Sequence, residues 1–107
     1  MTYADWTIRL LPEYQSQTTF RQDFTIADAF GAKAVRDTYR RAFSEWKDNV
    51  VYLTELVMVL NHKIWEHYEA GRHDLAGVYN ELWEQADHYA CSHLTGDDLS
   101  YFYRVTD

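Results

Sequence analysis

The stretch that decides the fold covers residues 49–69, NVVYLTELVMVLNHKIWEHYE, which is long, apolar at its centre and free of glycine and proline. Its main apolar positions recur every three or four residues, as in an amphipathic helix with a buried face. A thinner apolar seam, Val51, Met58 and Trp65, repeats every seven residues on the opposite side. Packed helices on both sides would cover this seam, whereas an exposed seam would bind a partner or a second copy of the chain. We therefore expect a central helix whose main face consists of Leu53, Leu56, Val57, Leu60, Ile64 and His67.

Apolar periodicity predicts further helices over residues 18–31, 32–47, 75–94 and 96 to about 104. In the first of them, Thr25 and Asp28 have the spacing of a capping box, which suggests a restart at Thr25 and an end at Gly31. The apolar phase continues without a slip over residues 35–60, so one continuous helix stays an alternative. The weak helix formers Asp48 and Asn49 favour a break there. The expected fold is all-α, a compact four- to five-helix bundle with an extended N-terminal arm.

The arm is residues 1–17, in which apolar and polar residues alternate before Leu11-Pro12 interrupts the pattern. Such alternation predicts an extended segment or short strand. A lone strand makes no sheet, so the arm is expected to lie on the bundle or on a partner. Its anchors would be Tyr3, Trp6, Ile8 and Leu10. Residues 18–107 would then form a single helical bundle domain.

Composition limits the class of protein. The 107 residues are 47% apolar with a net charge of −7, and residues 51–107 hold ten acids against three bases. This acidic balance argues against general nucleic-acid binding, which needs Lys and Arg for phosphate contacts. No apolar run approaches the roughly 18 residues of a membrane span, and MTYADWTIRLLPEYQ lacks the pattern of a signal peptide. With Cys91 as the single cysteine, no intramolecular disulfide can form, so we expect a soluble cytoplasmic protein without membrane partners.

Catalytic, cofactor and metal motifs are absent from the sequence. No histidine follows a glutamate at the Glu-x-x-His spacing of di-iron bundles, and four scattered glycines cannot build a phosphate loop. We therefore expect no enzyme and no catalytic, cofactor-binding or metal-binding residues. His67 and His93 lie on apolar faces and are expected to be core histidines with hydrogen-bond partners. Two looser acid and histidine stripes could hold a metal if they faced each other, but both lie opposite the main apolar faces and are expected to face water on different sides. They are Glu55, His62, Glu66 and Glu69 on one helix, and Glu84, His88 and Cys91 on the next.

Two charged surfaces offer alternative functions. A basic stripe on residues 32–47 suggests phosphate binding. Ala27 and Gly31, which precede it, have the spacing of the small residue and the turn glycine in a helix-turn-helix unit. The match then fails, because Asp37 and Arg40 stand where a recognition helix needs apolar residues. The stripe consists of Lys33, Arg36, Arg40 and Lys47. The same pattern is also typical of a solvated flank whose long side chains cover an apolar edge. An acidic face could imitate nucleic-acid phosphate and block a DNA-binding protein; it consists of Glu81, Glu84, Asp87, Asp97 and Asp98.

The segments TIADAFG, TYRRAF, YLTELVMVLN and SYFYR carry a resemblance over residues 18–107. They resemble a group of small all-helical proteins of gut bacteria, often carried on conjugative or phage-like mobile elements. The resemblance implies an accessory origin and no particular activity. The leading hypothesis is a non-enzymatic protein–protein interaction or regulatory module, with homodimerisation through the Val51, Met58 and Trp65 seam as a specific version. DNA binding through residues 32–47 and nucleic-acid mimicry are the alternatives.

Overall fold

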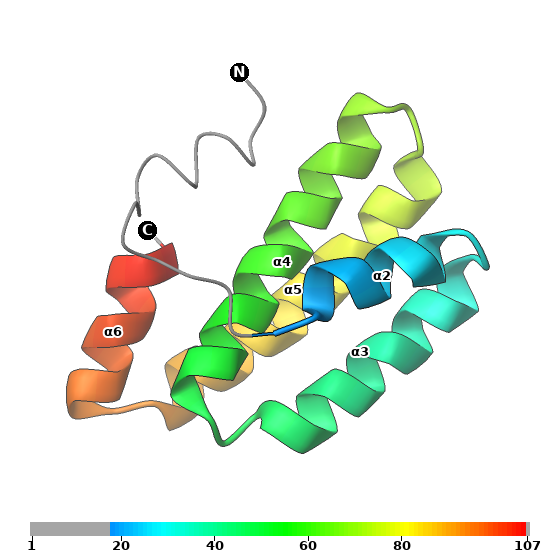
Figure 1. Cartoon of the computed structure of the whole chain (residues 1–107). Helices are drawn as coiled ribbons and strands as arrows, with labels where there is room; N and C mark the ends of the chain where they lie inside the picture. Colours follow the sequence, from blue (N-terminus) through cyan, green and yellow to red (C-terminus); the bar gives the residue numbers. More distant parts are fainter. Residues whose placement is uncertain (1–17, 107) are drawn as a thin grey trace.

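The structure, a computed structural model, describes residues 18–106, and these form five helices and no strand. The helices are α2 (Phe20–Asp28), α3 (Ala32–Trp46), α4 (Val50–Glu69), α5 (His73–His93) and α6 (Gly96–Thr106) (Figure 1). The prediction of an all-α, four- to five-helix bundle is confirmed, whereas the predicted arm and its anchors lie outside the described residues. Among the helices described, none is long and apolar enough to cross a membrane.

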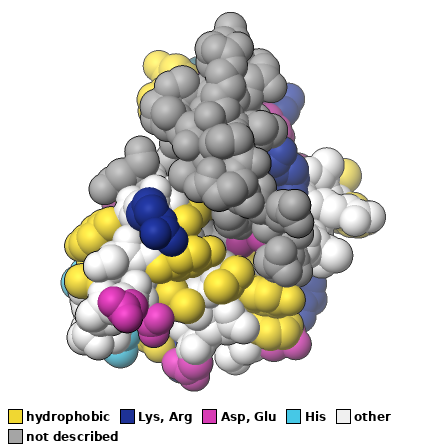
Figure 2. All heavy atoms as spheres, turned by 60° about the vertical axis from the view of Figure 1, so that its left-hand side comes forward, with side chains coloured by type: hydrophobic (Ala, Val, Ile, Leu, Met, Phe, Trp, Pro, Cys, Tyr) yellow, Lys and Arg dark blue, Asp and Glu magenta, His cyan; other side chains and the backbone are white. Residues whose placement is uncertain are grey.

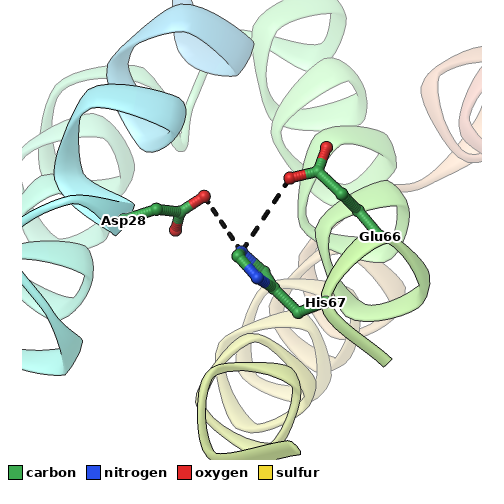
Figure 3. A group of neighbouring side chains, drawn as sticks. All are labelled: Asp28, Glu66 and His67. Carbon is green, nitrogen blue, oxygen red and sulfur yellow. Dashed lines mark hydrogen bonds and ion pairs between the residues drawn. The ribbon is translucent and has the colours of Figure 1, made fainter. Parts of the chain in front are cut away.

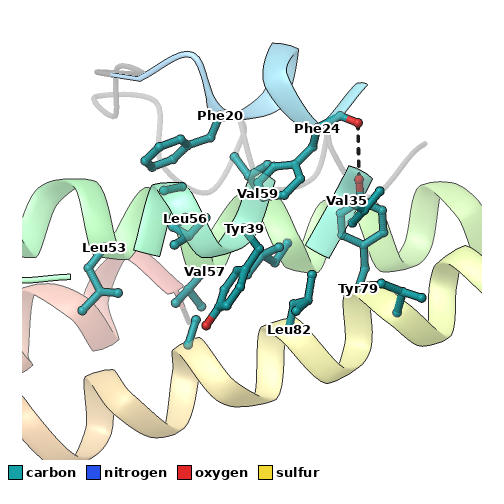
Figure 4. Packing of buried hydrophobic residues seen from close by; sticks show 14 of the residues in the cluster. Phe20, Phe24, Val35, Tyr39, Leu53, Leu56, Val57, Val59, Tyr79 and Leu82 are labelled. Carbon is teal, nitrogen blue, oxygen red and sulfur yellow. Dashed lines mark hydrogen bonds between the residues drawn. The ribbon is translucent and has the colours of Figure 1, made fainter. Parts of the chain in front are cut away.

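The core surrounds α4, as its composition predicts. α4 packs along α5, the hairpin of α2 and α3 covers one side of this pair, and α6 packs on the other side of α4 (Figure 1). Every residue from Leu53 to Leu60 is buried, including Met58 of the predicted seam. Aromatic side chains of α2, α3 and α5 meet this helix, among them Phe24, Tyr39 and Tyr79 (Figure 4). On the side of the molecule where α6 lies, hydrophobic side chains gather beside acidic ones (Figure 2).

Local capping interactions end α3 and bound α4. Asn49 is the N-cap of α4, and its side-chain oxygen accepts a hydrogen bond from the Tyr52 amide at 3.1 Å. This cap confirms the predicted break between the two helices. At the other end, Gly71 has φ of 80°, and the Arg72 amide donates to the His67 carbonyl oxygen at 2.9 Å. That pattern is a Schellman motif, in which glycine adopts the left-handed conformation that other residues avoid.

Two predicted helix starts are wrong. α2 begins at Phe20 and runs through Thr25, whose hydroxyl donates to the Arg21 carbonyl oxygen inside the helix. Because Asp28 then stands at the end of α2, its carboxylate is available for contacts with other helices. α5 begins at His73, with Arg72 as N-cap, and not at residue 75 as predicted. The Schellman turn after α4 leads the chain into α5 two residues earlier than the apolar periodicity predicted.

Candidate functional site

A cluster of polar side chains joins α2, α4 and α5 around the carboxylate of Asp28. Its Oδ2 accepts hydrogen bonds from Lys63 Nζ at 3.0 Å and His67 Nε2 at 2.9 Å, and its Oδ1 accepts one from the Tyr79 hydroxyl at 2.5 Å. The side chains of Lys63 and His67 are 2% and 1% exposed. One carboxylate therefore ties three helices together. We call the set the Asp28 cluster, and its members are Asp28, Lys63, His67 and Tyr79, with Thr25, Glu66 and Arg72 at the edge.

Hydrogen-bond donors define the protonation of this cluster. Arg72 Nε donates to His67 Nδ1 at 2.8 Å, and a guanidinium can only donate, so Nδ1 carries the lone pair and Nε2 the hydrogen. His67 is therefore a neutral imidazole that donates to Asp28, and its ring stacks on Tyr79 with centroids 5.4 Å apart. Burial and the hydrogen bond to Asp28 raise the pKa of Tyr79, which keeps its hydroxyl a donor. The prediction of His67 as a core histidine with a partner is confirmed.

Sequence spacing explains part of the cluster. Lys63, Glu66 and His67 stand at i, i+3 and i+4 on α4, so their side chains lie on one face of the helix. The Schellman turn after α4 brings Arg72 back over the end of that face. Asp28 reaches the same point only because α2 crosses α4 there, which no local signal could indicate.

Three members of the cluster have the donor types of a metal site. Ligand atoms of Asp28, Glu66 and His67 lie within 4.8 Å of one another, and this is the one such group among residues 18–106 (Figure 3). However, Lys63 Nζ lies 3.0 Å from an oxygen of both carboxylates and already supplies the positive charge. A histidine that binds a metal normally donates through its other ring nitrogen, whereas His67 Nδ1 accepts from Arg72. The geometry is that of a structural junction, in which Lys63 pairs with both carboxylates and Arg72 donates to His67.

A second histidine of α4 is also buried, which corrects the expectation that its stripe faces water. Glu55 is 3% and His62 9% exposed, because the surrounding helices leave only Glu66 and Glu69 of that stripe at the surface. Arg21 Nη2 lies 2.5 Å from His62 Nδ1. Burial, and next the Arg21 charge, lower the pKa of His62 to about 4, against the opposing effect of Glu66. His62 is therefore neutral at physiological pH.

The stripe on α5 behaves as expected, and one core histidine does not. Glu84, His88 and Cys91 are exposed. His93 was predicted to be buried, but it is exposed, and its ring stacks on Tyr89 with centroids 4.0 Å apart. The apolar face of α5 ends at the buried Ala90, so the last turn extends beyond the core.

A groove of about 650 Å³ runs along the surface between α2 and α3. The α2 side is a single stripe at helical spacing, and its residues are Thr19, Phe20, Asp23, Ile26, Ala27 and Phe30. The α3 side is a matching stripe that consists of Ala34, Asp37, Thr38, Arg41, Ala42, Glu45 and Trp46. Each helix thus buries one face in the core and contributes a second face to the groove.

Exposed apolar side chains border this groove. Phe30 is 78% and Ile26 55% exposed, and they are the two most exposed large apolar residues of α2 and the turn that follows it. Phe30 stands before Gly31, whose φ of 101° turns the chain into α3. The groove has a mixed lining, with Asp23, Asp37, Arg41 and Glu45 beside the apolar residues, and exposed apolar side chains within it are typical of a protein interaction surface. This surface was not predicted from the sequence, although the α2 residues share a helical stripe.

The predicted seam does not form a continuous exposed surface. Met58 is 9% exposed and Val51 is half-buried, whereas Trp65 is 43% exposed. Trp65 packs edge-on against Tyr68, with ring centroids 5.8 Å apart. The helices around α4 cover the middle of the seam, so of the two alternatives the covered seam holds at Met58 and the exposed one does not.

Each residue of the predicted basic stripe makes contacts within the molecule. Asp37 forms two ion pairs: Lys33 Nζ lies 2.8 Å from its Oδ2, and Arg40 Nη1 lies 3.1 Å from its Oδ1. The hydrogen bond from Lys33 contributes most to the lowered pKa of Asp37. Two further contacts join α3 to α5: Arg36 Nη2 lies 2.9 Å from Glu81 Oε2, and Lys47 Nζ lies 6.0 Å from the Tyr89 ring centroid. These contacts are those of a solvated flank, and phosphate binding by the stripe stays a prediction.

The acidic face is divided between two helices. Glu81 pairs with α3, Glu84 accepts a hydrogen bond from Asn80, and Asp87 lies one turn further along α5. Asp97 and Asp98 are exposed in the first turn of α6, where acids stabilise the helix N-terminus. The structure thus gives Glu81, Asp97 and Asp98 local roles, and nucleic-acid mimicry stays a prediction.

No protein-family model matches the chain, and no curated protein or solved structure matches it. The resemblance to mobile-element proteins of gut bacteria therefore stays a prediction. Functional inference depends on the geometry of the chain itself.

Proposed function

We propose that this protein is a non-enzymatic, cytoplasmic interaction module that binds a helical segment of a protein partner in the groove between α2 and α3. The observation that carries the proposal is the exposure of Phe30 and Ile26 in a groove that polar and charged side chains also line. Leaving these side chains in water is unfavourable, and burying them against a partner would recover the hydrophobic free energy. A mobile-element origin, as the sequence resemblance implies, is compatible with such an accessory role.

The lining of the groove indicates the chemistry of the partner. Phe20, Ile26 and Phe30 favour apolar side chains at helical spacing, as in other cases of a helix bound in a groove. Arg41 and Glu45 line the same groove, and neither forms an ion pair within residues 18–106. A bound helix would therefore need both an acidic and a basic side chain beside its apolar stripe. Such a helix is our proposed ligand.

The test places a photo-crosslinking amino acid, p-benzoylphenylalanine, at position 30 of the full chain in cells. Position 68 is the matched control, because Tyr68 is also an exposed aromatic residue, at 55%, but lies on α4. We expect an adduct from position 30 and none from position 68, with a helical segment as the crosslinked peptide. The segment is then synthesised, and Phe30→Asp should weaken its binding to the purified protein at least 10-fold, which corresponds to one buried aromatic anchor.

Two results would contradict the proposal. Equal adducts from positions 30 and 68 would mean that the groove has no specific ligand. Loss of the adduct on nuclease treatment would favour the alternative in which the basic residues of α3, Lys33 to Lys47, bind DNA.

A further inference from the structure

We infer that the helix bound in the groove belongs to a second copy of this chain, so that two α2–α3 hairpins pack against each other around a two-fold axis. This inference rests on the proposed function, because it names the partner for the same groove. It places the homodimer contact on α2 and α3 and not on the Val51, Met58 and Trp65 seam, whose central residue is buried.

A row of charges along α3 carries the inference. Lys33, Asp37, Arg41 and Glu45 follow one another at intervals of four residues and alternate in sign. The last three line the groove, and the side chain of Lys33 is 89% exposed. Residues four apart form one ridge on a helix surface, so these four side chains lie along the same side of α3.

The order of these charges is self-complementary. When two antiparallel copies of α3 cross near Tyr39, Asp37 of one copy lies opposite Arg41 of the other. Further out, Lys33 lies opposite Glu45. A two-fold axis repeats each pair, so every charge of the row meets an opposite charge. Lys33 and Asp37 already pair within one copy, so a parallel arrangement, or a partner without this alternation, would bring like charges together or leave Arg41 and Glu45 without an opposite charge.

The same arrangement accounts for the exposed aromatic residue. With the crossing near Tyr39, Phe30 of one copy comes close to Trp46 of the second copy, which lines the far end of the groove. Two such contacts, one at each end, would bury both copies of Phe30. Aromatic anchors in pockets are the usual hot spots of protein interfaces.

Electrostatics over the whole chain also favour this surface. Residues 20–47 carry six bases against four acids, whereas residues 51–107 carry three bases against ten acids. Two copies of a chain with net charge −7 repel each other least when the hairpins approach and the acidic halves stay apart. The groove has 13 lining residues per copy, fewer than the roughly 20–30 of a standard interface, so we expect a weak dimer with a dissociation constant on the order of micromolar.

The test measures molar mass by analytical ultracentrifugation from roughly 1 µM to 1 mM, the range of a weak dimer. We expect a concentration-dependent dimer for the unaltered chain. Asp37→Arg, Arg41→Glu and Phe30→Asp should each weaken it at least 10-fold, whereas the control Tyr68→Asp should not. An equimolar mixture of Asp37→Arg with Arg41→Glu should form a heterodimer, because each altered copy then meets opposite charges on the other. Circular dichroism verifies that all variants fold.

The outcomes separate this inference from the proposed function. A chain that stays monomeric over the whole range, or a dimer that Trp65→Glu dissociates while the α3 variants do not, would overturn the second copy as partner. The proposed function would survive either result if position 30 still crosslinks to a helix of another protein. If neither the crosslink nor the dimer forms, the proposed function and the homodimer inference are both refuted. Recovery of the dimer in the charge-reversed mixture supports the two-fold arrangement, since an unrelated effect of the substitutions would not produce it.

Discussion

Replacing Lys63 by methionine should destabilise the fold strongly, because it removes a buried charge from the Asp28 cluster. The ammonium group donates to Thr25 Oγ1 at 2.8 Å and to Asp28 Oδ2 and Glu66 Oε2 at 3.0 Å each. Methionine fills a similar volume but leaves the Asp28 carboxylate, 13% exposed, without its nearest positive charge. The perturbation therefore tests whether the polar junction holds α2 against α4.

The expected loss follows from the burial of the pair. Removing one partner of a buried ion pair typically costs 3–5 kcal/mol of unfolding free energy. Asp28 keeps hydrogen bonds from His67 and Tyr79, so the lower end, about 3 kcal/mol, is expected. A domain of this size is stable by about 5–15 kcal/mol, so the variant should still fold.

The assay is urea unfolding at pH 7, followed by circular dichroism and tryptophan fluorescence. Lys33→Met is the matched control, because Lys33 Nζ lies 2.8 Å from Asp37 Oδ2 while its side chain is 89% exposed. Exposed ion pairs contribute little, so the control should leave the unfolding midpoint almost unchanged. A double-mutant cycle with Asp28→Asn should show a coupling of at least about 1 kcal/mol. If Lys63→Met lowers the midpoint no more than Lys33→Met, the reasoning on the buried junction is refuted.

Three further predictions concern pH and helix ends, and equilibrium unfolding measures each. His62 becomes protonated near its ordinary pKa of about 6.5 in the unfolded chain but only near about 4 in the folded chain, so the free energy of unfolding should fall by about 2 kcal/mol between pH 7 and pH 5. The substitution His62→Gln should remove most of that loss, whereas His88→Gln, at an exposed position, should not. Asn49→Ala should cost about 1 kcal/mol through the lost cap of α4, and an unchanged midpoint would contradict the capping role. Gly71→Ala should destabilise by about 1–2 kcal/mol because φ is 80°, whereas Gly77→Ala inside α5 should stabilise by up to about 1 kcal/mol, and effects of the same sign would count against the backbone argument.

Helix boundaries and core faces were largely accessible from the sequence, because neighbours in the chain determine them. Asn49 and Gly71 bound α4 through contacts with residues at most four positions away. The apolar period of α4 indicated its buried face, and Leu53, Leu56 and Leu60 are fully buried. The capping box at Thr25 failed because the helix already starts at Phe20, and packing against α4 overrides a local signal of that size.

The candidate sites depend on contacts that sequence spacing does not reveal. No sequence pattern marks Lys63 as buried, because its partners Asp28 and Thr25 lie 35 and 38 positions away. The groove needs two helix stripes that face the same side, and their relative rotation is set by how α2 and α3 dock on α4.

The sequence by itself determined an all-α chain, the limits of its long helices and the apolar faces that build the core. These properties follow from backbone hydrogen bonding, capping and the helical period, which act within a few residues. Only the tertiary structure decided that Met58 and His62 are buried, that Asp28 joins three helices and that Phe30 stands exposed beside a groove. Burial is a property of the assembled bundle, because a side chain loses contact with water only when a distant helix covers it.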